Sequence, residues 1–337
     1  MAITSADLLR VFFLTTLSFL VAILWTPLLS HFLYKFRLHK QIRNETWDGQ
    51  PATIFRQMHK SKSGTPTMGG LLIWVTVAFV TILFNFSRSQ TWLPVFVLVM
   101  SGGLGFIDDF LNIRGKISGL SARLKFVFQF LIAGLGAWWF YYKLDFSQIR
   151  IPAASLFHIP DMLDIGWLYI PLFVLTVVFL TNAVNITDGL DGLAGGTLAA
   201  SFTAIMALAL ARGQIGIAVF AGTVIGALLA FLWFNIYPAR FFMGDTGAFA
   251  LGATLAVLAF LTNSVILLPI IGFVFIIEAL STLIQFVAKR YFHRKVFLVA
   301  PMHHHFEAQG WPETKVTMRF WVIAAVFATI GIAIGLI

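Results

Sequence analysis

Carboxylates and imidazoles, the side chains that bind cations and transfer protons, are few in this chain and are gathered into short clusters. Only 14 of its 337 residues are Asp or Glu, and 8 are His. Four polar motifs lie at the ends of long apolar segments: Asp108-Asp109, Asn185–Gly192, Met243–Asp245 and Met302–Phe306. If those segments cross a membrane, all four motifs lie on the same side of it. Such a patch is what a reaction between a lipid and a water-soluble anion requires, so an enzyme is the first hypothesis.

The spacing of the polar residues predicts side chains that point apart in the Asp108-Asp109 motif and side chains that share a face in the Asn185–Gly192 motif. Side chains of adjacent helical residues point about 100° apart, so one of Asp108 and Asp109 can face a metal while the other faces a substrate. Asn185, Asp188 and Asp191 recur at every third position, so they share one face if the segment stays helical. Each motif alone also fits a bland role, as a solvated helix end or an N-cap of the next helix.

Three consecutive histidines, His303, His304 and His305, cannot easily ligate one ion, because a catalytic zinc site draws on His spaced to share one face. We expect them to donate hydrogen bonds to phosphate or sugar oxygens, with a charge tuned near neutral pH. Glu278 is the only acid deep within an apolar run. A deep acid indicates function or a buried pairing, and pairing is the stronger expectation.

Basic residues complete the patch. Lys62, Lys116 and Lys125 flank the glycine-rich and acidic motifs, and their compact ammonium groups suit diphosphate oxygens as point charges. Each of these lysines, taken alone, also fits a role as a basic residue that anchors a helix end at the membrane surface.

The composition is that of an integral membrane protein. Hydrophobic residues make up 59% of the chain and charged residues 11%, with a mean hydropathy of +0.89, so there are too few polar groups to cover a soluble surface. Apolar runs that could cross about 30 Å of hydrocarbon as helices predict ten spans near 8–33, 69–86, 93–107, 124–140, 167–184, 193–210, 215–234, 247–261, 265–287 and 318–337. The fold class is therefore all-α and polytopic, with residues 1–337 forming a single transmembrane catalytic domain.

The basic residues also predict the orientation. Most of the 23 Lys and Arg lie in loops after the odd-numbered spans, and the positive-inside rule makes those loops cytoplasmic. Both termini are then outside, the active site lies at the cytoplasmic face, and the first span is retained rather than cleaved. The net charge of +9 fits anionic lipid head groups, and no nucleic acid is expected as a partner. The absence of Cys excludes a disulfide framework and a thiolate nucleophile.

Six motifs together resemble a known family over nearly the whole chain. They are Gly64–Gly70, Asp108-Asp109-Phe110, Asn182–Gly192, Phe234–Pro238, Phe242–Asp245 and Pro301–Phe306. The resemblance is to the phospho-N-acetylmuramoyl-pentapeptide transferases of bacterial peptidoglycan synthesis. It implies transfer of phospho-MurNAc-pentapeptide from UDP-MurNAc-pentapeptide to undecaprenyl phosphate, which yields lipid I and UMP. It also implies Mg2+ as cofactor, a homodimer, contact with membrane lipid, and a place in the bacterial cytoplasmic (inner) membrane.

The resemblance assigns roles to individual residues. Those implied to be catalytic are Asp108, Asp109, Asp245, His303, His304, His305, Lys116 and Lys125. Those implied to bind substrate are Lys62, Thr67, Asn182, Asn185, Asp188, Asp191, Asn235, Phe242 and Gln285. The implied Mg2+ ligands are Asp245, Asp108 and Asp109. Donor and acceptor are both phosphates, so a hard cation held by carboxylates fits the repulsion that the reaction must overcome.

Two other functions remain open. A related polyprenyl-phosphate transferase acting on UDP-GlcNAc would share the acidic motifs, but the unbroken Met302–Phe306 motif favours the muramoyl-pentapeptide enzymes. A secondary transporter would place its coupling acids near the membrane midplane, whereas only Glu278 is deep here.

Overall fold

The structure is a computed structural model that describes residues 3–39, 64–87, 89–114, 119–152, 154 and 158–337. Helices make up nearly all of its regular structure. They are α1 (Ser5–Lys35), α3 (Gly70–Phe84), α4 (Trp92–Ile113), α5 (Ala122–Lys143), α6 (Tyr169–Thr187), α7 (Leu193–Ala211), α8 (Ile215–Asn235), α9 (Gly244–Leu261), α10 (Leu268–Ile271), α11 (Phe273–Phe292), α12 (Met302–Ala308) and α13 (Glu313–Leu336). Two short 3₁₀ helices, η3 (Gly166–Leu168) and η4 (Val265–Leu267), precede α6 and α10. The all-α, polytopic prediction is confirmed.

Each of the ten apolar segments predicted to span a membrane is helical in the structure. Among the described residues, eight helices are long and apolar enough to cross a bilayer, and η4 with α10 forms a ninth candidate with α11, although the two parts are bent by 79°. The remaining segment, α3, has only 15 residues, which at about 1.5 Å per residue is shorter than the hydrocarbon core. The count of ten spans therefore stays a prediction.

The two strands found among the described residues lie between α5 and α6. Strands β1 (Gln148–Arg150) and β2 (Met162–Asp164) form an antiparallel ribbon in which Ile149 pairs with Leu163. The all-α prediction did not include them, because a strand of three residues is too short for an alternating pattern to be visible.

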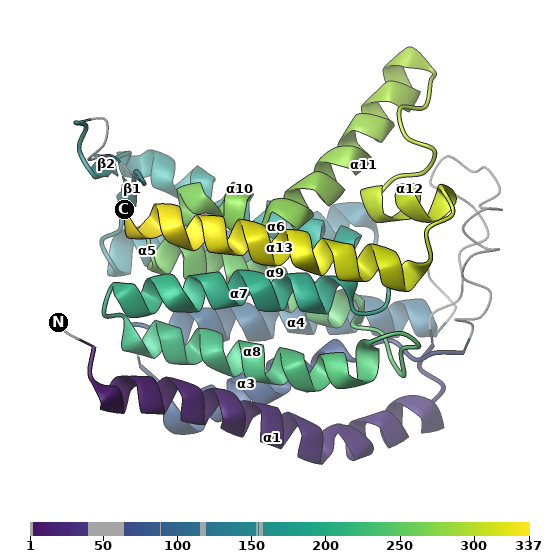
Figure 1. Ribbon diagram of the computed structural model, residues 1–337, viewed down its shortest axis with the longest axis horizontal. Coiled ribbons are helices and arrows are strands. Elements are labelled where there is room, and N and C mark those ends of the chain that lie inside the picture. Colours follow the sequence, from purple (N-terminus) through teal and green to yellow (C-terminus); the bar gives the residue numbers. More distant parts are fainter. Residues whose placement is uncertain (1–2, 40–63, 88, 115–118, 153, 155–157) are drawn as a thin grey trace.

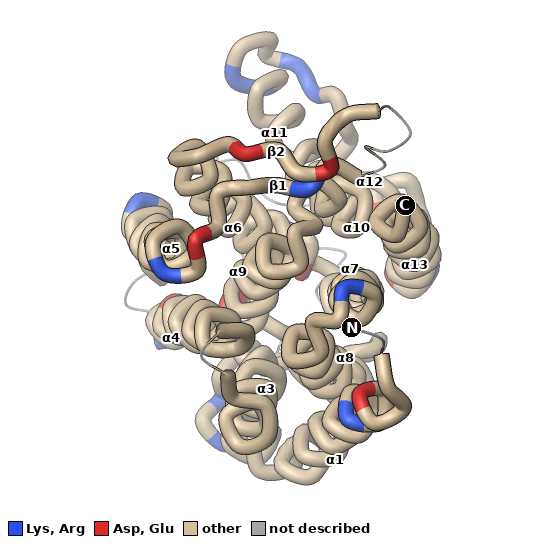
Figure 2. The backbone as a smooth tube through the Cα atoms, turned by 90° about the vertical axis from the view of Figure 1, so that its left-hand side faces the viewer, with Lys and Arg blue, Asp and Glu red and all other residues tan. Residues whose placement is uncertain are grey.

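Helix α9 is the centre of the bundle. Every residue in its most apolar window is buried, and it packs against α3, α4, α6, α7 and α8. Figure 2, which views the bundle from the end that carries both termini, shows these helices around α9. The outer helices expose large apolar side chains, such as Leu24 of α1, which is 78% exposed. Helices that pair their own backbone groups and present an apolar exterior are what a lipid environment requires.

The two ends of the bundle differ. Both termini and the β1–β2 ribbon lie at one end, on the left of Figure 1, whereas α12 lies at the other end. Helix α11 projects from the bundle at that second end (Figure 1) and has Lys289 and Arg290 in its last turn. The shared end for the two termini agrees with an even number of spans.

Glycines allow the helices that carry the polar motifs to approach closely. A Cβ added to Gly105 of α4 would meet the backbone of Asp245, and one added to Gly70 would meet the backbone of Gly247. Small residues at such crossings let backbones pack together in a membrane protein. The first contact brings the end of α4, with its two aspartates, against the start of α9.

We expect Gly105→Ala to lower the unfolding temperature of the detergent-solubilised protein, because the added methyl must displace the backbone at Asp245. Overpacking of this kind costs about 1–3 kcal/mol. The matched control is Gly103→Ala, since the space beside Gly103 is open; it should leave the unfolding temperature unchanged or raise it slightly. Equal unfolding temperatures for the two variants would contradict the close packing of α4 on α9.

Candidate active site

A lysine joins two carboxylates where α4, α5 and α9 meet. The Lys125 Nζ lies 2.7 Å from Asp108 Oδ2 and 3.0 Å from Asp245 Oδ2. Asn185 of α6 donates from Nδ2 to the other oxygen of Asp245 at 2.9 Å. The structure thus brings together four predicted site residues from four helices, all near the end of the bundle opposite the termini.

The turn before α5 closes around Asp108. Leu120 N donates to Asp108 Oδ1 at 2.7 Å, and Gly119 has a φ of +74°, with no room for a Cβ beside the Asp108 carboxylate. Ser121 then caps α5 by accepting from Leu124 N. Since Asp108 is only 1% exposed, its carboxylate is held by fixed donors rather than by bulk water.

Asp109 points away from Asp108, as the helical spacing predicted. Its Oδ2 accepts from Thr246 N at 3.0 Å and from Thr246 Oγ1 at 2.8 Å. A carboxylate at the start of α9 is favourable because the first turn of a helix presents unpaired N–H groups. A Cβ on Gly244 would meet Asp109 Oδ2 and Thr67 Oγ1, so Thr67 lies close to the same point.

The segment Asn185–Gly192 is not one continuous helix, so Asp191 does not share a helical face with Asn185. Helix α6 ends at Thr187, and Gly192, with a φ of +76°, begins α7. Neither aspartate caps α7 with its side chain. Instead, Asp188 Oδ2 accepts from Gly244 N at 3.1 Å and Asp191 Oδ2 accepts from Ala239 N at 2.9 Å. The two carboxylates therefore connect the turn to the loop before α9.

Asn235 and Gln285 bond to backbone groups of nearby loops. Asn235 accepts from Gly192 N at 3.0 Å and donates to Phe241 O at 2.9 Å. Gln285 accepts from Val296 N and Phe297 N, both at 3.0 Å. These contacts set the shape of the loops.

Asn182 and Phe242 are two further residues predicted to bind substrate, and they contact a side chain and a backbone carbonyl, respectively. Asn182 donates to Gln129 Oε1 at 2.8 Å, one turn deeper than Asn185. The backbone of Phe242 donates to Pro66 O at 2.8 Å, which holds its loop against the Gly64–Gly70 motif.

The three histidines of α12 have different surroundings. His303 is fully buried and lies against Glu278, with 2.9 Å between Nδ1 and Oε2, so the expected buried pairing of Glu278 is confirmed. His304 pairs with Glu307 at 2.6 Å. His305 Nδ1 accepts from Leu298 N at 3.2 Å. Only part of the cluster is therefore available for contact with a substrate in this arrangement.

Some residues of the site were predicted and others were missed. Lys62 and Lys116 lie outside the described residues. Sequence reasoning did not single out Thr246, Gln129 or Glu313, whose Oε1 accepts from Asp191 N at 2.7 Å. Thr246 directly follows a predicted aspartate and could have been found, whereas nothing in the spacing connects Glu313 with Asp191.

Lys125, Asp108, Asp245 and Asn185 form what we call the Lys125 junction. The side chains of this junction offer hard oxygen donors. The described part of the chain holds no group of three or more His, Asp or Glu that could hold a metal ion. Asp108 and Asp245 nevertheless converge on one cationic point, the Lys125 ammonium. Because protein Mg2+ sites commonly use one or two carboxylates, with waters and substrate phosphates as the other ligands, this donor set fits Mg2+.

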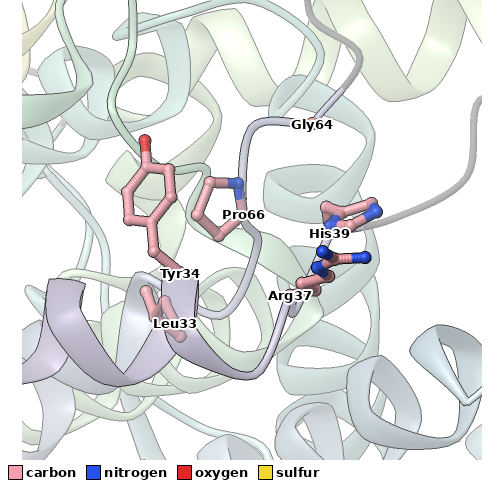
Figure 3. A pocket seen from close by; sticks show the side chains of 6 residues that line it. All are labelled: Leu33, Tyr34, Arg37, His39, Gly64 and Pro66. Carbon is pink, nitrogen blue, oxygen red and sulfur yellow. The ribbon is translucent and has the colours of Figure 1, made fainter.

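A separate pocket of about 240 Å³ lies at the end of α1. It is lined by Leu33, Tyr34, Arg37, His39, Gly64 and Pro66, and Figure 3 shows Pro66 between Tyr34 and His39. Tyr34 donates from its hydroxyl to Arg240 O at 2.8 Å. None of the described residues that line this pocket is a carboxylate or belongs to the Lys125 junction, so the two places are distinct.

Comparison with known proteins decides the family. Residues 91–263 match the family model for glycosyl transferase family 4, and residues 62–73 match the phospho-N-acetylmuramoyl-pentapeptide-transferase signature 1. A phospho-N-acetylmuramoyl-pentapeptide-transferase from Chloroflexus aggregans is 42% identical over 350 aligned residues, covering 100% of this chain and 92% of the relative. Another from a Geobacillus species is 40% identical over 324 residues, covering 94% of this chain and 95% of the relative. The chain belongs to the phospho-N-acetylmuramoyl-pentapeptide-transferase family.

Membership of this family confirms the resemblance inferred from the motifs and makes the chain a transferase. The matched range 91–263 contains α4 to α9, and with them all four residues of the Lys125 junction. The signature at residues 62–73 contains Thr67, which lies beside Asp109 and Gly244 in the structure.

Proposed function

We propose that this transferase moves phospho-MurNAc-pentapeptide from UDP-MurNAc-pentapeptide to undecaprenyl phosphate, forming lipid I and UMP. The observation that carries the proposal is the Lys125 junction, in which Asp108 and Asp245 flank one ammonium group at the end of an apolar bundle. Near-full-length similarity to relatives of that name supports it. The proposal requires the lipid acceptor to approach this place from the bilayer and the nucleotide to approach it from water.

The reaction joins two anions. An oxygen of undecaprenyl phosphate attacks the sugar-linked phosphorus of the donor, the bond from that phosphorus to the bridging oxygen breaks, and UMP leaves with the electron pair. Repulsion between the phosphates is the main obstacle, so positioning and charge compensation are the main tasks of the protein. Lys125 supplies one fixed positive charge. Asp108 and Asp245 would hold Mg2+, with Asp109 beside them, and the bound ion would offset the diphosphate charge.

The donor is assigned to the turn between α6 and α7. Asp188 and Asp191, with Asn182, Lys62 and Thr67, would hold the nucleotide end. Asn235, Phe242 and Gln285 would shape the surrounding loops. Lys116 and the exposed edges of the histidine cluster would contact phosphate and sugar oxygens.

The direct test is UMP release by the purified protein with undecaprenyl phosphate and Mg2+. We expect release with UDP-MurNAc-pentapeptide, no release with UDP-GlcNAc, and loss of release when a chelator removes the divalent cation. Release with UDP-GlcNAc alone would assign the chain to the other substrate class. Release that persists in the chelator would contradict the proposed use of Mg2+.

The proposed membrane is the bacterial cytoplasmic (inner) membrane, with the Lys125 junction on the cytoplasmic side and the chain acting as a homodimer. The chain has no Cys, so a single introduced Cys reports one position. We expect a membrane-impermeant maleimide to label Asp161→Cys, in the exposed turn between β1 and β2, in intact cells. Lys295→Cys, exposed after α11, should react only after the membrane is opened. The reverse pattern would invert the orientation.

Asp108 is expected to position the acceptor or the cation rather than to remove a proton. The second pKa of a phosphate monoester is near 6, so most of the acceptor is already ionised at neutral pH. Asp108→Asn should lower kcat by about a hundredfold or more, by a similar factor at each pH from about 6 to 9. Asp161→Asn, at the other end of the bundle, is the matched control and should retain activity. Recovery of the Asp108→Asn rate as the pH rises would make proton removal the main role.

A further inference from the structure

One buried acid in the chain has a partner but no assigned role. Glu278 of α11 and His303 of α12 are both 0% exposed. The Glu278 carboxylate is bonded twice to the same residue, since Oε1 accepts from the His303 backbone N–H at 3.1 Å and Oε2 lies 2.9 Å from its ring Nδ1. An ionised carboxylate can only accept hydrogen bonds, so opposite such a carboxylate Nδ1 is the donor. The two contacts fix both the start of α12 and the orientation of the imidazole.

The opposite edge of the ring lies against the turn between α6 and α7. His303 Nε2 is buried and has no hydrogen-bond partner among the described residues. A Cβ added to Gly189 would meet this atom before any other, so the ring packs against the glycine backbone where a side chain would stand in any other residue. Leaving a buried polar atom without a partner costs about 1–3 kcal/mol. The Glu278 contacts hold the ring in place despite that cost.

Hydrogen bonds connect the turn that contains Gly189 to the Lys125 junction. The neighbouring Asp188 carboxylate accepts from Gly244 N at 3.1 Å, and the next residue is Asp245, which bonds Lys125 and Asn185. Glu278 therefore reaches the turn through His303, and the turn is bonded to the first residue of α9. A displaced imidazole would release the turn on the side that faces α12.

We propose that Glu278 is a positioning residue for the nucleotide donor: it holds the His303 ring against Gly189 and thereby sets the place of the Asp188–Asp191 turn. This rests on the proposed function, in which that turn binds the UDP end of the donor. Filling space does not require a carboxylate and an imidazole, because buried polar pairs can often be replaced by apolar side chains without loss of stability. A carboxylate with two acceptor contacts to one histidine defines an orientation that an apolar contact would leave free.

The test compares KM values for the two substrates in the full-length enzyme. Glu278→Gln removes the charge, and His303→Asn keeps a donor near the position of Nδ1 but removes the ring edge that touches Gly189. Each should raise the KM for UDP-MurNAc-pentapeptide, and the Kd for UMP, by about tenfold. The KM for undecaprenyl phosphate should stay within about twofold. Because Glu278 acts through His303, the double variant should be no worse than the poorer single variant.

Glu307→Gln is the control, since it changes the acid that pairs with His304 and leaves both contacts between Glu278 and His303 in place. It should therefore raise the donor KM less than Glu278→Gln does. The inference is overturned if the donor KM is unchanged in both single variants, or if the effects of Glu278→Gln and His303→Asn multiply. If Glu278→Gln does not fold, His303→Asn decides alone, because it leaves Glu278 with a donor. A wild-type enzyme that releases no UMP overturns the proposed function as well, whereas an active one with an unchanged donor KM in the variants overturns only this inference.

Discussion

The contact of Lys125 with Asp108 and Asp245 is the interaction on which the rest of the site depends. Removing two carboxylates from water costs several kcal/mol for each ion unless an opposite charge compensates them. A single ammonium at 2.7 and 3.0 Å does so, and it belongs to a third helix. The ends of α4, α5 and α9 must therefore meet at one point, and the glycine contact between Gly105 and the Asp245 backbone makes that approach sterically possible.

The other aspartates hold the loops around that point. Asp109, Asp188 and Asp191 each accept from a backbone N–H of the segment 239–246. An apolar bundle has little water to satisfy such groups, so unpaired amides at its end would be costly. The same carboxylates that are proposed to meet cation and nucleotide thus also determine the backbone that surrounds them. Substitutions at these positions change loop geometry and binding together.

The sequence predicted the parts of this arrangement that depend on local pattern. Ten apolar runs became helices because their length and composition leave no alternative in a bilayer. The divergence of Asp108 and Asp109 followed from the helical period. The end of α6 at Thr187 could not be foreseen, because the spacing of Asn185, Asp188 and Asp191 fits a helix as well as a turn. Long-range partners such as Lys125 for Asp245, or Glu313 for Asp191, depend on how the helices pack and have no signature in the spacing.

The charge of the Lys125 junction also constrains how a nucleotide can enter. With the three groups ionised, two carboxylates and one ammonium sum to a net charge of −1. The low dielectric at the end of an apolar bundle strengthens the effect of that charge on a second anion. A diphosphate approaching the junction alone would be repelled by it, whereas a diphosphate accompanied by a divalent cation would not. The junction therefore favours a nucleotide that enters together with its divalent cation or after that cation has bound. Before the cation binds, Lys125 keeps the two carboxylates in place.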